Sequence, residues 1–293
     1  MRIVVTGCRG FVGTHWTRKL EQLGYEVVAL DLRRGVDLND WDRVERIGPL
    51  EVMVPLAART FVPASYERPR EFYHTNTLAT LNALELCRLH RAKMIFASSY
   101  VYGEPRYLPI DEAHPAVAFN PYAQSKLIGE TLCRAYNRDF GVPVIIFRPF
   151  NIYGMGQHKS FLIPSILSQV QKGEVRLKDP RPKRDLLHID DLVAAYCKAV
   201  AYDRTSFEIF NIASGESYSV AEIVAMITEA LNPNARVIFT GEKRKNEVLD
   251  TKADIRKAGE GLNWRPVVGF SEGVKGLLEG MRFKDKRRLT RAA

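Results

Sequence analysis

The 293-residue sequence has only four cysteines, no hydrophobic run long enough to cross a membrane and no internal repeat. The cysteines are far apart and form no CxxC pair, which argues against a disulfide-stapled scaffold or a metal site (Cys8, Cys87, Cys133 and Cys197). A helix needs about 20 consecutive apolar residues to span a bilayer, and no stretch approaches this length. A strand is expected directly after Met1, so we expect no signal peptide. Together these features predict a cytoplasmic protein with reduced thiols.

The charge is unevenly balanced, with 43 Lys and Arg against 34 Asp and Glu and a net charge of +9. A basic balance suits an anionic ligand and also suits nucleic acid. Much of the excess lies in the segment 282–291, which carries no series of interleaved aromatic residues for stacking on bases. We interpret this segment as a solvated tail and do not expect nucleic acid as a partner. Hydrophobic residues make up 46% of the chain, which is ample for a sizeable core.

The first 31 residues predict a strand, a helix and a second strand. Residues 2–6 form a β-branched run that leads into a glycine-rich turn, and residues 27–30 form a second apolar run that ends at Asp31. Glycines let the backbone turn sharply and approach a pyrophosphate, whose charge is favoured at the helix N-terminus. Asp31 follows the last of these glycines at the spacing of an acid that hydrogen-bonds an adenosine ribose. This pattern predicts a dinucleotide-binding unit.

Strands and helices continue to alternate over about 150 residues, which predicts an α/β fold with a doubly wound parallel (Rossmann) sheet covered on both faces. Beyond Arg148 the pattern loosens and indicates a smaller α/β lobe. We therefore expect a nucleotide-binding domain over residues 1–150 and a mainly substrate-binding lobe over residues 151–293. The expected strands after the first two are 51–54, 94–97 and 142–147, with short ones near 175, 207 and 237. The expected helices are 70–90, one from about 122, and 162–171, 191–202, 220–231 and 271–281.

Three residues of different chemistry converge on one end of this expected sheet. Tyr122 and Lys126 are four residues apart on a helix and share one face, while Ser98 follows the strand 94–97. Ligands of parallel sheets bind at the carboxyl ends of the strands. An ordinary tyrosine titrates near pH ~10, so ionising it at pH 7 costs about 4 kcal/mol, and a neighbouring cation lowers that cost. The set predicts a site that removes a proton from an alcohol.

Several segments resemble the extended short-chain dehydrogenase/reductases, and most closely the NAD-dependent epimerase/dehydratase family, which acts on nucleotide sugars. The resemblance covers nearly the whole chain. It is carried by segments 6–13, 98–103 and Tyr122-Ala-Gln-Ser-Lys126 in the first half. Further segments that match are 56–58 with Asn76, then 148–154, 184–191, 210–215 and 262–266.

The resemblance implies NAD as the cofactor and a nucleotide sugar as the substrate. It implies that the catalytic residues are Ser98, Tyr122 and Lys126. The residues that it places against the cofactor are Gly7, Gly10, Phe11, Val12, Gly13, Asp31, Asp37, Leu38, Leu56, Ala57, Ala58, Asn76, Tyr122, Lys126 and Pro149. Those that it places against the substrate are Ser98, Tyr122, Asn151, Arg184 and Arg244, where the arginines suit phosphate oxygens.

The sequence departs from the family pattern at three places. Pro55 stands where the family usually has histidine, and we do not expect this to abolish binding. Arg33 and Arg34 follow Asp31, and arginines at this place can accept the 2′-phosphate of NADP. Asp31 would repel that phosphate, so NAD remains the expected cofactor. Tyr100 stands where the dehydratase branch carries a catalytic glutamate, which favours an epimerase.

The reaction expected is therefore C4 epimerisation through a transient 4-keto sugar, with Tyr122 as the base. A 4-keto-sugar reductase or a 4,6-dehydratase of the same family is an alternative, and a non-catalytic relative that binds nucleotide or RNA is another. The resemblance also implies a homodimer formed by the helices over 70–90 and from 122. Their apolar faces include Leu81, Leu84, Leu127, Ile128 and Leu132.

Overall fold

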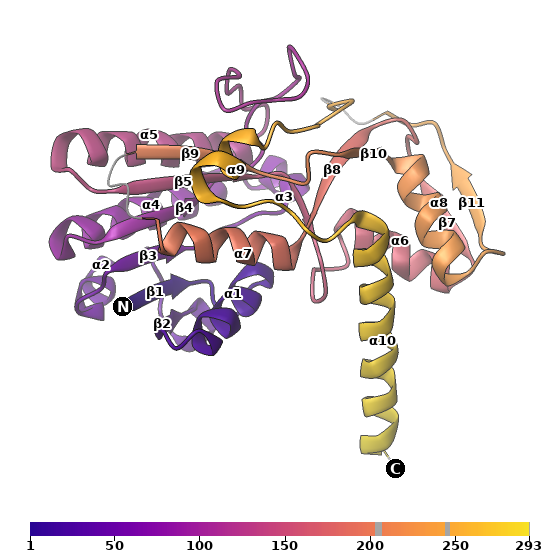
Figure 1. Ribbon diagram of the computed structural model, residues 1–293, viewed down its shortest axis with the longest axis horizontal. Helices are drawn as coiled ribbons and strands as arrows, with labels where there is room; N and C mark the ends of the chain where they lie inside the picture. Colours follow the sequence, from indigo (N-terminus) through magenta and orange to yellow (C-terminus); the bar gives the residue numbers. More distant parts are fainter. Residues whose placement is uncertain (203–206, 244–246, 293) are drawn as a thin grey trace.

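The computed structural model describes residues 1–202, 207–243 and 247–292, with side chains described as far as Met281. Its largest layer is a six-stranded sheet in the order β2-β1-β3-β4-β5-β9, in which every neighbouring pair is parallel. The strands are β1 (Arg2–Thr6), β2 (Glu26–Leu30), β3 (Val52–Pro55), β4 (Lys93–Ala97), β5 (Val144–Pro149) and β9 (Phe207–Ile212) (Figure 1). This confirms the expected doubly wound α/β fold.

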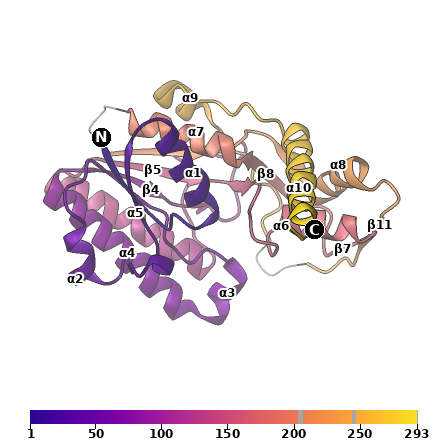
Figure 2. The same cartoon turned by 90° about the horizontal axis from the view of Figure 1, so that it is seen from below.

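Helices cover both faces of this sheet because its strands are apolar on both sides. Ile3 and Val5 of β1 face one way and pack with Trp16 and Leu20, whereas Val4 faces the other way. The first face is covered by α1 (Phe11–Gln22) and α7 (Ile189–Val200), and the second by α2 (Trp41–Val44), α4 (Pro69–His90) and α5 (Pro121–Phe140) (Figure 2). Leu84 lies fully buried in the second core layer, so it is not available to the dimer face for which it was expected.

Helix α5 begins and ends where the sequence supplies caps. The side chain of Asn120 accepts a hydrogen bond from the backbone N–H of Ala123 at 2.8 Å, and Pro121 occupies the first turn. Gly141 ends the helix in the left-handed conformation that glycine tolerates. These caps fix the register of the helix that carries Tyr122 and Lys126.

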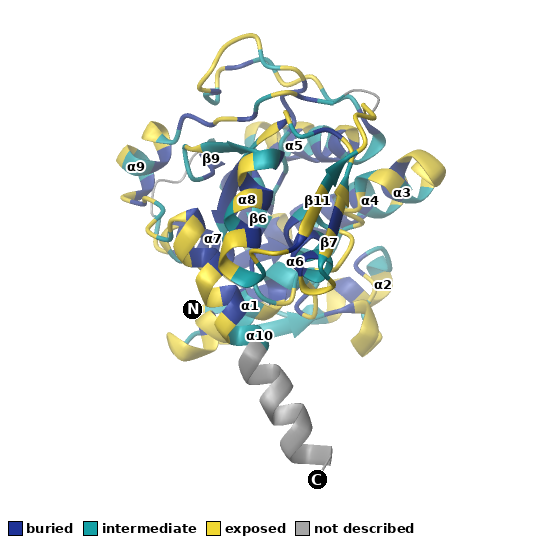
Figure 3. Cartoon of the chain, turned by 90° about the vertical axis from the view of Figure 1, so that its right-hand side faces the viewer, coloured by how far each residue is buried: buried dark blue, intermediate teal, exposed yellow. Residues whose placement is uncertain are grey.

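The rest of the chain forms a smaller lobe beside the carboxyl ends of the sheet strands. It contains a three-stranded sheet of β6 (Asn151–Tyr153), β8 (Lys183–His188) and β10 (Ser217–Ser219), and a two-stranded sheet of β7 (Glu174–Leu177) and β11 (Arg236–Phe239). Its own core lies between these strands and the helices α6 (Leu162–Gln171), α8 (Val220–Leu231) and α10 (Phe270–Ala292), as the dark blue segments of Figure 3 show. The remaining short elements are η1 (Leu32–Arg34), η2 (Glu45–Ile47), α3 (Val62–Glu67) and α9 (Arg256–Leu262).

Two features differ from the expected layout. Strand β9 and helix α7 lie beyond residue 150, yet β9 pairs with β5 as the last strand of the large sheet and α7 packs on that sheet's first face. The helix expected over 271–281 continues as α10 to Ala292, so the basic segment interpreted as a tail belongs to a helix. All four cysteines are free, and three of them are buried. Within the described residues we find no helix with the length and apolarity needed to cross a membrane.

Candidate active site

The turn between β1 and α1 has no room for side chains at its glycine positions. Gly7 has a φ of +64°, and a Cβ atom there would lie 2.7 Å from the backbone nitrogen of Ala57. A Cβ atom at Gly13 would overlap the carbonyl oxygen of Gly7. The helix begins at Gly10 without a side-chain cap, so its first N–H groups remain available to a ligand. Such a bare helix N-terminus in a glycine cradle fits the pyrophosphate of a dinucleotide.

Asp31 lies at the end of β2, directly beside this turn. Its carboxylate accepts hydrogen bonds from the backbone N–H groups of Arg9 at 3.0 Å and Arg33 at 2.9 Å. The guanidinium of Arg34 turns back to the carbonyl of Ala29 at 3.3 Å. The carboxylate is therefore held in a fixed orientation at the place where an adenosine ribose is expected.

Two further residues expected against the cofactor are anchored differently. Asp37 accepts a hydrogen bond from the backbone N–H of Asn39 at 2.9 Å, while the side chain of Leu38 lies buried in the core under α4. The carbonyl of Leu38 accepts a hydrogen bond from the side chain of Asn82 at 2.8 Å. The segment is thus fixed to α4 through its backbone.

The loop after β3 contains Leu56, Ala57 and Ala58 and is tied to its surroundings on both sides. The backbone N–H of Ala57 donates to the hydroxyl of Thr6 at 3.2 Å. Asn76, which is 3% exposed, bonds to the backbone N–H and carbonyl of Arg59 and donates to the hydroxyl of Ser125 at 2.9 Å. Asn76 therefore joins this loop to α5, next to Lys126.

The three residues of the expected catalytic set meet at the carboxyl end of β4. The ammonium of Lys126 donates to the carbonyl of Ala97 at 2.8 Å, immediately before Ser98. Tyr122 is half-buried one turn earlier on the same face of α5, within reach of a hydrogen bond with Ser99. The structure therefore brings Ser98, Tyr122 and Lys126 to one strand end.

Burial changes the acid–base properties of both helical residues. It lowers the pKa of Lys126 to about 8, because the charged ammonium is disfavoured away from water. Burial raises the pKa of Tyr122, and the hydrogen bond with Ser99 acts in the opposite direction. A tyrosine that works as a base here therefore depends on nearby positive charge, which the ammonium of Lys126 supplies while it is protonated.

Two residues to which the sequence analysis gave no role are linked to Ser98, Glu130 directly and Arg148 through Glu130. The hydroxyl of Ser98 donates to Glu130 at 2.5 Å, and Glu130 is bonded twice to the guanidinium of Arg148. Glu130 follows Lys126 by four residues, so its place on the same face of α5 was readable from the helical spacing. Arg148 stands at the end of β5, before Pro149.

Two of the residues expected at the substrate lie on strands of the smaller lobe, Asn151 on β6 and Arg184 on β8. The side-chain amide of Asn151 donates to the carbonyl of Asp185 at 3.2 Å. Arg184 donates to the carbonyl of Val248 at 2.9 Å and forms an ion pair with Glu247. Arg244 lies outside the described residues, so its expected role cannot be compared with a position.

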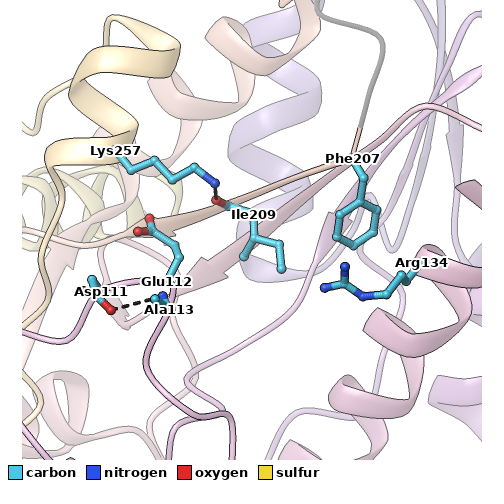
Figure 4. A pocket seen from close by; sticks show the side chains of 7 residues that line it. All are labelled: Asp111, Glu112, Ala113, Arg134, Phe207, Ile209 and Lys257. Carbon is cyan, nitrogen blue, oxygen red and sulfur yellow. Dashed lines mark hydrogen bonds between the residues drawn. The ribbon is translucent and has the colours of Figure 1, made fainter.

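Two cavities lie outside the catalytic set. One of about 460 Å³ adjoins β8 and β10 and is lined by Lys183, Glu216, Ser217, Tyr218, Asp250 and Lys252. The other, of about 440 Å³, lies at the outer edge of β9 and contains none of the expected site residues (Figure 4). There the ammonium of Lys257 donates to the carbonyl of Ile209, and the guanidinium of Arg134 lies over the ring of Phe207 (Figure 4).

Comparison with known proteins gives one family. The model of the "NAD dependent epimerase/dehydratase family" matches residues 3–213. A protein of Methanocaldococcus jannaschii, provisionally assigned as a UDP-glucose 4-epimerase, is 34% identical over 96% of this chain and 98% of its own length. A GDP-6-deoxy-D-mannose reductase of Pseudomonas aeruginosa is 27% identical over 94% of this chain and 96% of its own.

Solved structures with the same fold include enzymes of different reaction types. The UDP-glucose 4-epimerase of Thermotoga maritima with UDP-glucose has a TM-score of 0.88 at 27% identity and covers 97% of this chain and 99% of its own. The UDP-glucose 4-epimerase of Thermus thermophilus in complex with NAD has a TM-score of 0.87 at 29% identity, over 96% and 99%. A dTDP-glucose 4,6-dehydratase of Streptomyces venezuelae has a TM-score of 0.87 at 26% identity, over 96% and 97%.

Proposed function

Since the chain belongs to the NAD-dependent epimerase/dehydratase family and is thus an NAD-dependent enzyme, we propose that it is a nucleotide-sugar 4-epimerase. The similarity to UDP-glucose 4-epimerases supports UDP-sugars as the first substrates to test. The similarity to a reductase and a dehydratase means that the reaction type must be argued from the site itself.

The hydrogen bonding and burial of Tyr100 are the observations that favour an epimerase over a dehydratase. A 4,6-dehydratase must remove the C5 proton and expel the C6 hydroxyl, and its branch places a carboxyl group after the catalytic Ser or Thr for this purpose. Here the phenol of Tyr100 donates to the carbonyl of Gly103 at 2.6 Å, and burial raises its pKa further above the ordinary value of 10. A phenol bound in this way is a poor acid or base at neutral pH. An epimerase needs no such second group.

The three residues at the end of β4 suffice for the proton chemistry of epimerisation. Bound NAD supplies the reversible hydride acceptor for the sugar carbon. Tyr122, ionised beside the ammonium of Lys126, takes the proton of the C4 hydroxyl. It returns the proton after the keto sugar has rotated and presents its other face to the cofactor. The O–H of Ser98 donates to Glu130, so its oxygen accepts a hydrogen bond from the C4 hydroxyl before that proton passes to Tyr122. No net oxidation occurs, so the reaction consumes no reduced cofactor.

The fold suggests how the ligands divide between the two parts of the chain. We assign cofactor binding to residues 1–150 together with α7 and β9, and nucleotide-sugar binding mainly to the rest of 151–293. Asn151, Arg184 and Arg244 are proposed to meet the diphosphate of the substrate, because the planar guanidinium suits phosphate oxygens. Leu81, Leu127, Ile128 and Leu132 are half-buried on α4 and α5 and are proposed to form the face of a homodimer.

A screen of UDP-, GDP-, CDP- and dTDP-sugars with product analysis by NMR tests the proposal. We expect interconversion of two C4-epimeric nucleotide sugars without added NADH, and its loss in Tyr122→Phe. A strict requirement for stoichiometric NAD(P)H would instead support a 4-keto-sugar reductase. Tight RNA binding that survives Tyr122→Phe, with no sugar turnover, would support a non-catalytic relative.

A further inference from the structure

A buried ion pair lies behind the catalytic set and has no role in the chemistry described so far. Glu130 of α5 is 7% exposed and Arg148 of β5 is 5% exposed. The guanidinium donates twice, from Nε to Oε1 at 3.0 Å and from Nη2 to Oε2 at 2.6 Å. A buried ion pair is weak support for stability, because apolar residues of the same volume often replace it without loss. Its position beside a reactive site therefore calls for another explanation.

The pair fixes the hydroxyl of Ser98. Ser98 is 3% exposed, and its Oγ donates to the same Oε1 atom of Glu130 at 2.5 Å. A carboxylate only accepts hydrogen bonds and a serine has a single O–H group. The direction of the bond is therefore set by the ionised pair. The oxygen of Ser98 is held in one place, and its lone pairs remain for a further group.

The pair is itself held from the other side by Tyr102, in the loop after β4, and by Asn211 on β9. Nη1 of Arg148 donates to the phenol of Tyr102 at 3.1 Å, and the guanidinium lies over that ring with 5.0 Å to its centroid. The phenol of Tyr102 donates in turn to the side chain of Asn211 on β9 at 2.5 Å. Asn211 is fully buried and also donates to the carbonyl of Ile110. The network thus ties the position of Ser98 to α5, β5 and β9, which belong to the large sheet and to a helix that covers it.

We propose that Glu130 and Arg148 are positioning residues, which hold the oxygen of Ser98 where it accepts a hydrogen bond from the reacting hydroxyl of the nucleotide sugar. This inference rests on the proposed function, since fixing Ser98 affects turnover only if the C4 hydroxyl of the sugar reacts beside it. Reacting groups must be placed closely, and a displacement of about 1 Å can cost a hundredfold in rate. Neither residue touches the sugar, so the pair acts on turnover through Ser98 alone.

The test uses a variant that removes both charges. Glu130→Leu alone would leave the guanidinium of Arg148 buried and unpaired, so the double variant E130L/R148M is used. The chain supplies a matched control, because Glu85 and Arg88 on α4 form the same twofold Glu–Arg contact, at 3.0 and 2.6 Å, at the surface. E85L/R88M carries the same two substitutions away from Ser98.

We expect E130L/R148M to lower kcat at least about tenfold with KM changed less than about threefold, and the control to keep wild-type kcat. In a Ser98→Ala background the same double substitution should cost no further activity, because its effect passes through Ser98. A kcat within twofold of wild type, or an additional loss in the Ser98→Ala background, would overturn the inference. Glu130→Asp, which keeps the charge and withdraws the carboxylate, should also lower kcat, and unchanged turnover there counts equally against it.

A crystallographic readout separates this inference from the proposed function. The side chain of Ser98 should leave its rotamer in E130L/R148M and keep it in E85L/R88M. If wild type proves not to be an epimerase, the proposed function fails. An unchanged Ser98 rotamer in E130L/R148M would refute the positioning role by itself.

Discussion

Replacing Lys126 with methionine should abolish turnover and at the same time stabilise the folded protein. The side chain is 5% exposed, and burial lowers its pKa to about 8 from an ordinary 10.5. That difference corresponds to about 3 kcal/mol, which is the cost at pH 7 of keeping a charged ammonium inside the fold. Methionine has a similar length and no charge, so it removes this cost.

The substitution also loses a favourable contact. Lys126 donates to the carbonyl of Ala97 at 2.8 Å, and such a bond from a charged group contributes about 1.5 to 3 kcal/mol. The net expectation is a free energy of unfolding up to about 1.5 kcal/mol higher in Lys126→Met at pH 7, with kcat reduced at least about a hundredfold.

The lowered pKa of Lys126 also determines how the stability of wild type changes with pH. The folded pKa of Lys126 lies below the unfolded one, so between about pH 8 and 10.5 the unfolded chain binds more protons and wild type gains stability with rising pH. The advantage of Lys126→Met is therefore complete below pH 8 and shrinks as the pH rises. Urea denaturation at pH 7 and pH 9.5, on protein freed of nucleotide, measures both values.

Lys93→Met is the matched control, because it makes the same substitution with the opposite expectation. The ammonium of Lys93 donates to the carbonyls of Ala199, Val200 and Tyr202 at the end of α7, each at 2.9 Å. Losing these bonds should destabilise the fold by about 1 to 3 kcal/mol. A Lys126→Met protein that is less stable than wild type at pH 7, or a difference independent of pH, would refute the reasoning.

Three further predictions concern the cofactor and the assembly. NAD should bind more tightly than NADP, and Asp31→Ala should reduce the difference between the two affinities. Calorimetry that finds wild type preferring NADP would overturn the assignment of Asp31 to the adenosine ribose. Gly13→Ala should weaken NAD binding at least about a hundredfold, because its Cβ would overlap the carbonyl of Gly7, whereas Gly276→Ala on α10 meets nothing within 4 Å and should bind normally. Equal binding by the two glycine variants would contradict the cradle. Sedimentation at micromolar concentration should show a homodimer that Leu127→Glu dissociates, and a wild-type monomer would exclude it.

The large sheet could be predicted from the sequence because its signals are local. The β-branched run 2–6, the glycines after it and the caps of the following helices depend on neighbouring residues, and α6 and α8 have the predicted bounds. The strands β6, β8 and β10 escaped prediction as strands, since they have three to six residues and take their pairing from partners far along the chain. The membership of β9 in the large sheet is likewise a long-range pairing, with β5.

The same division applies to the site. The grouping of Ser98, Tyr122 and Lys126 could be predicted from the sequence. Ser98 follows the end of a strand, and Tyr122 and Lys126 are four residues apart on one helix. The contact of Glu130 with Arg148 joins residues 18 apart on different elements, and no local pattern encodes it. The ion pair of Arg184 with Glu247 joins residues 63 apart and was equally invisible in the sequence.

A tracer experiment tests the central claim most directly. UDP-galactose deuterated at C4 is incubated with the protein without added NAD(P)H, and the products are followed by NMR. A redox-neutral 4-epimerase should give UDP-glucose with the deuterium still at C4, and the same equilibrium should be reached from UDP-glucose. Deuterium at C6 of a 4-keto-6-deoxy sugar, or conversion only with stoichiometric NAD(P)H, would contradict the account.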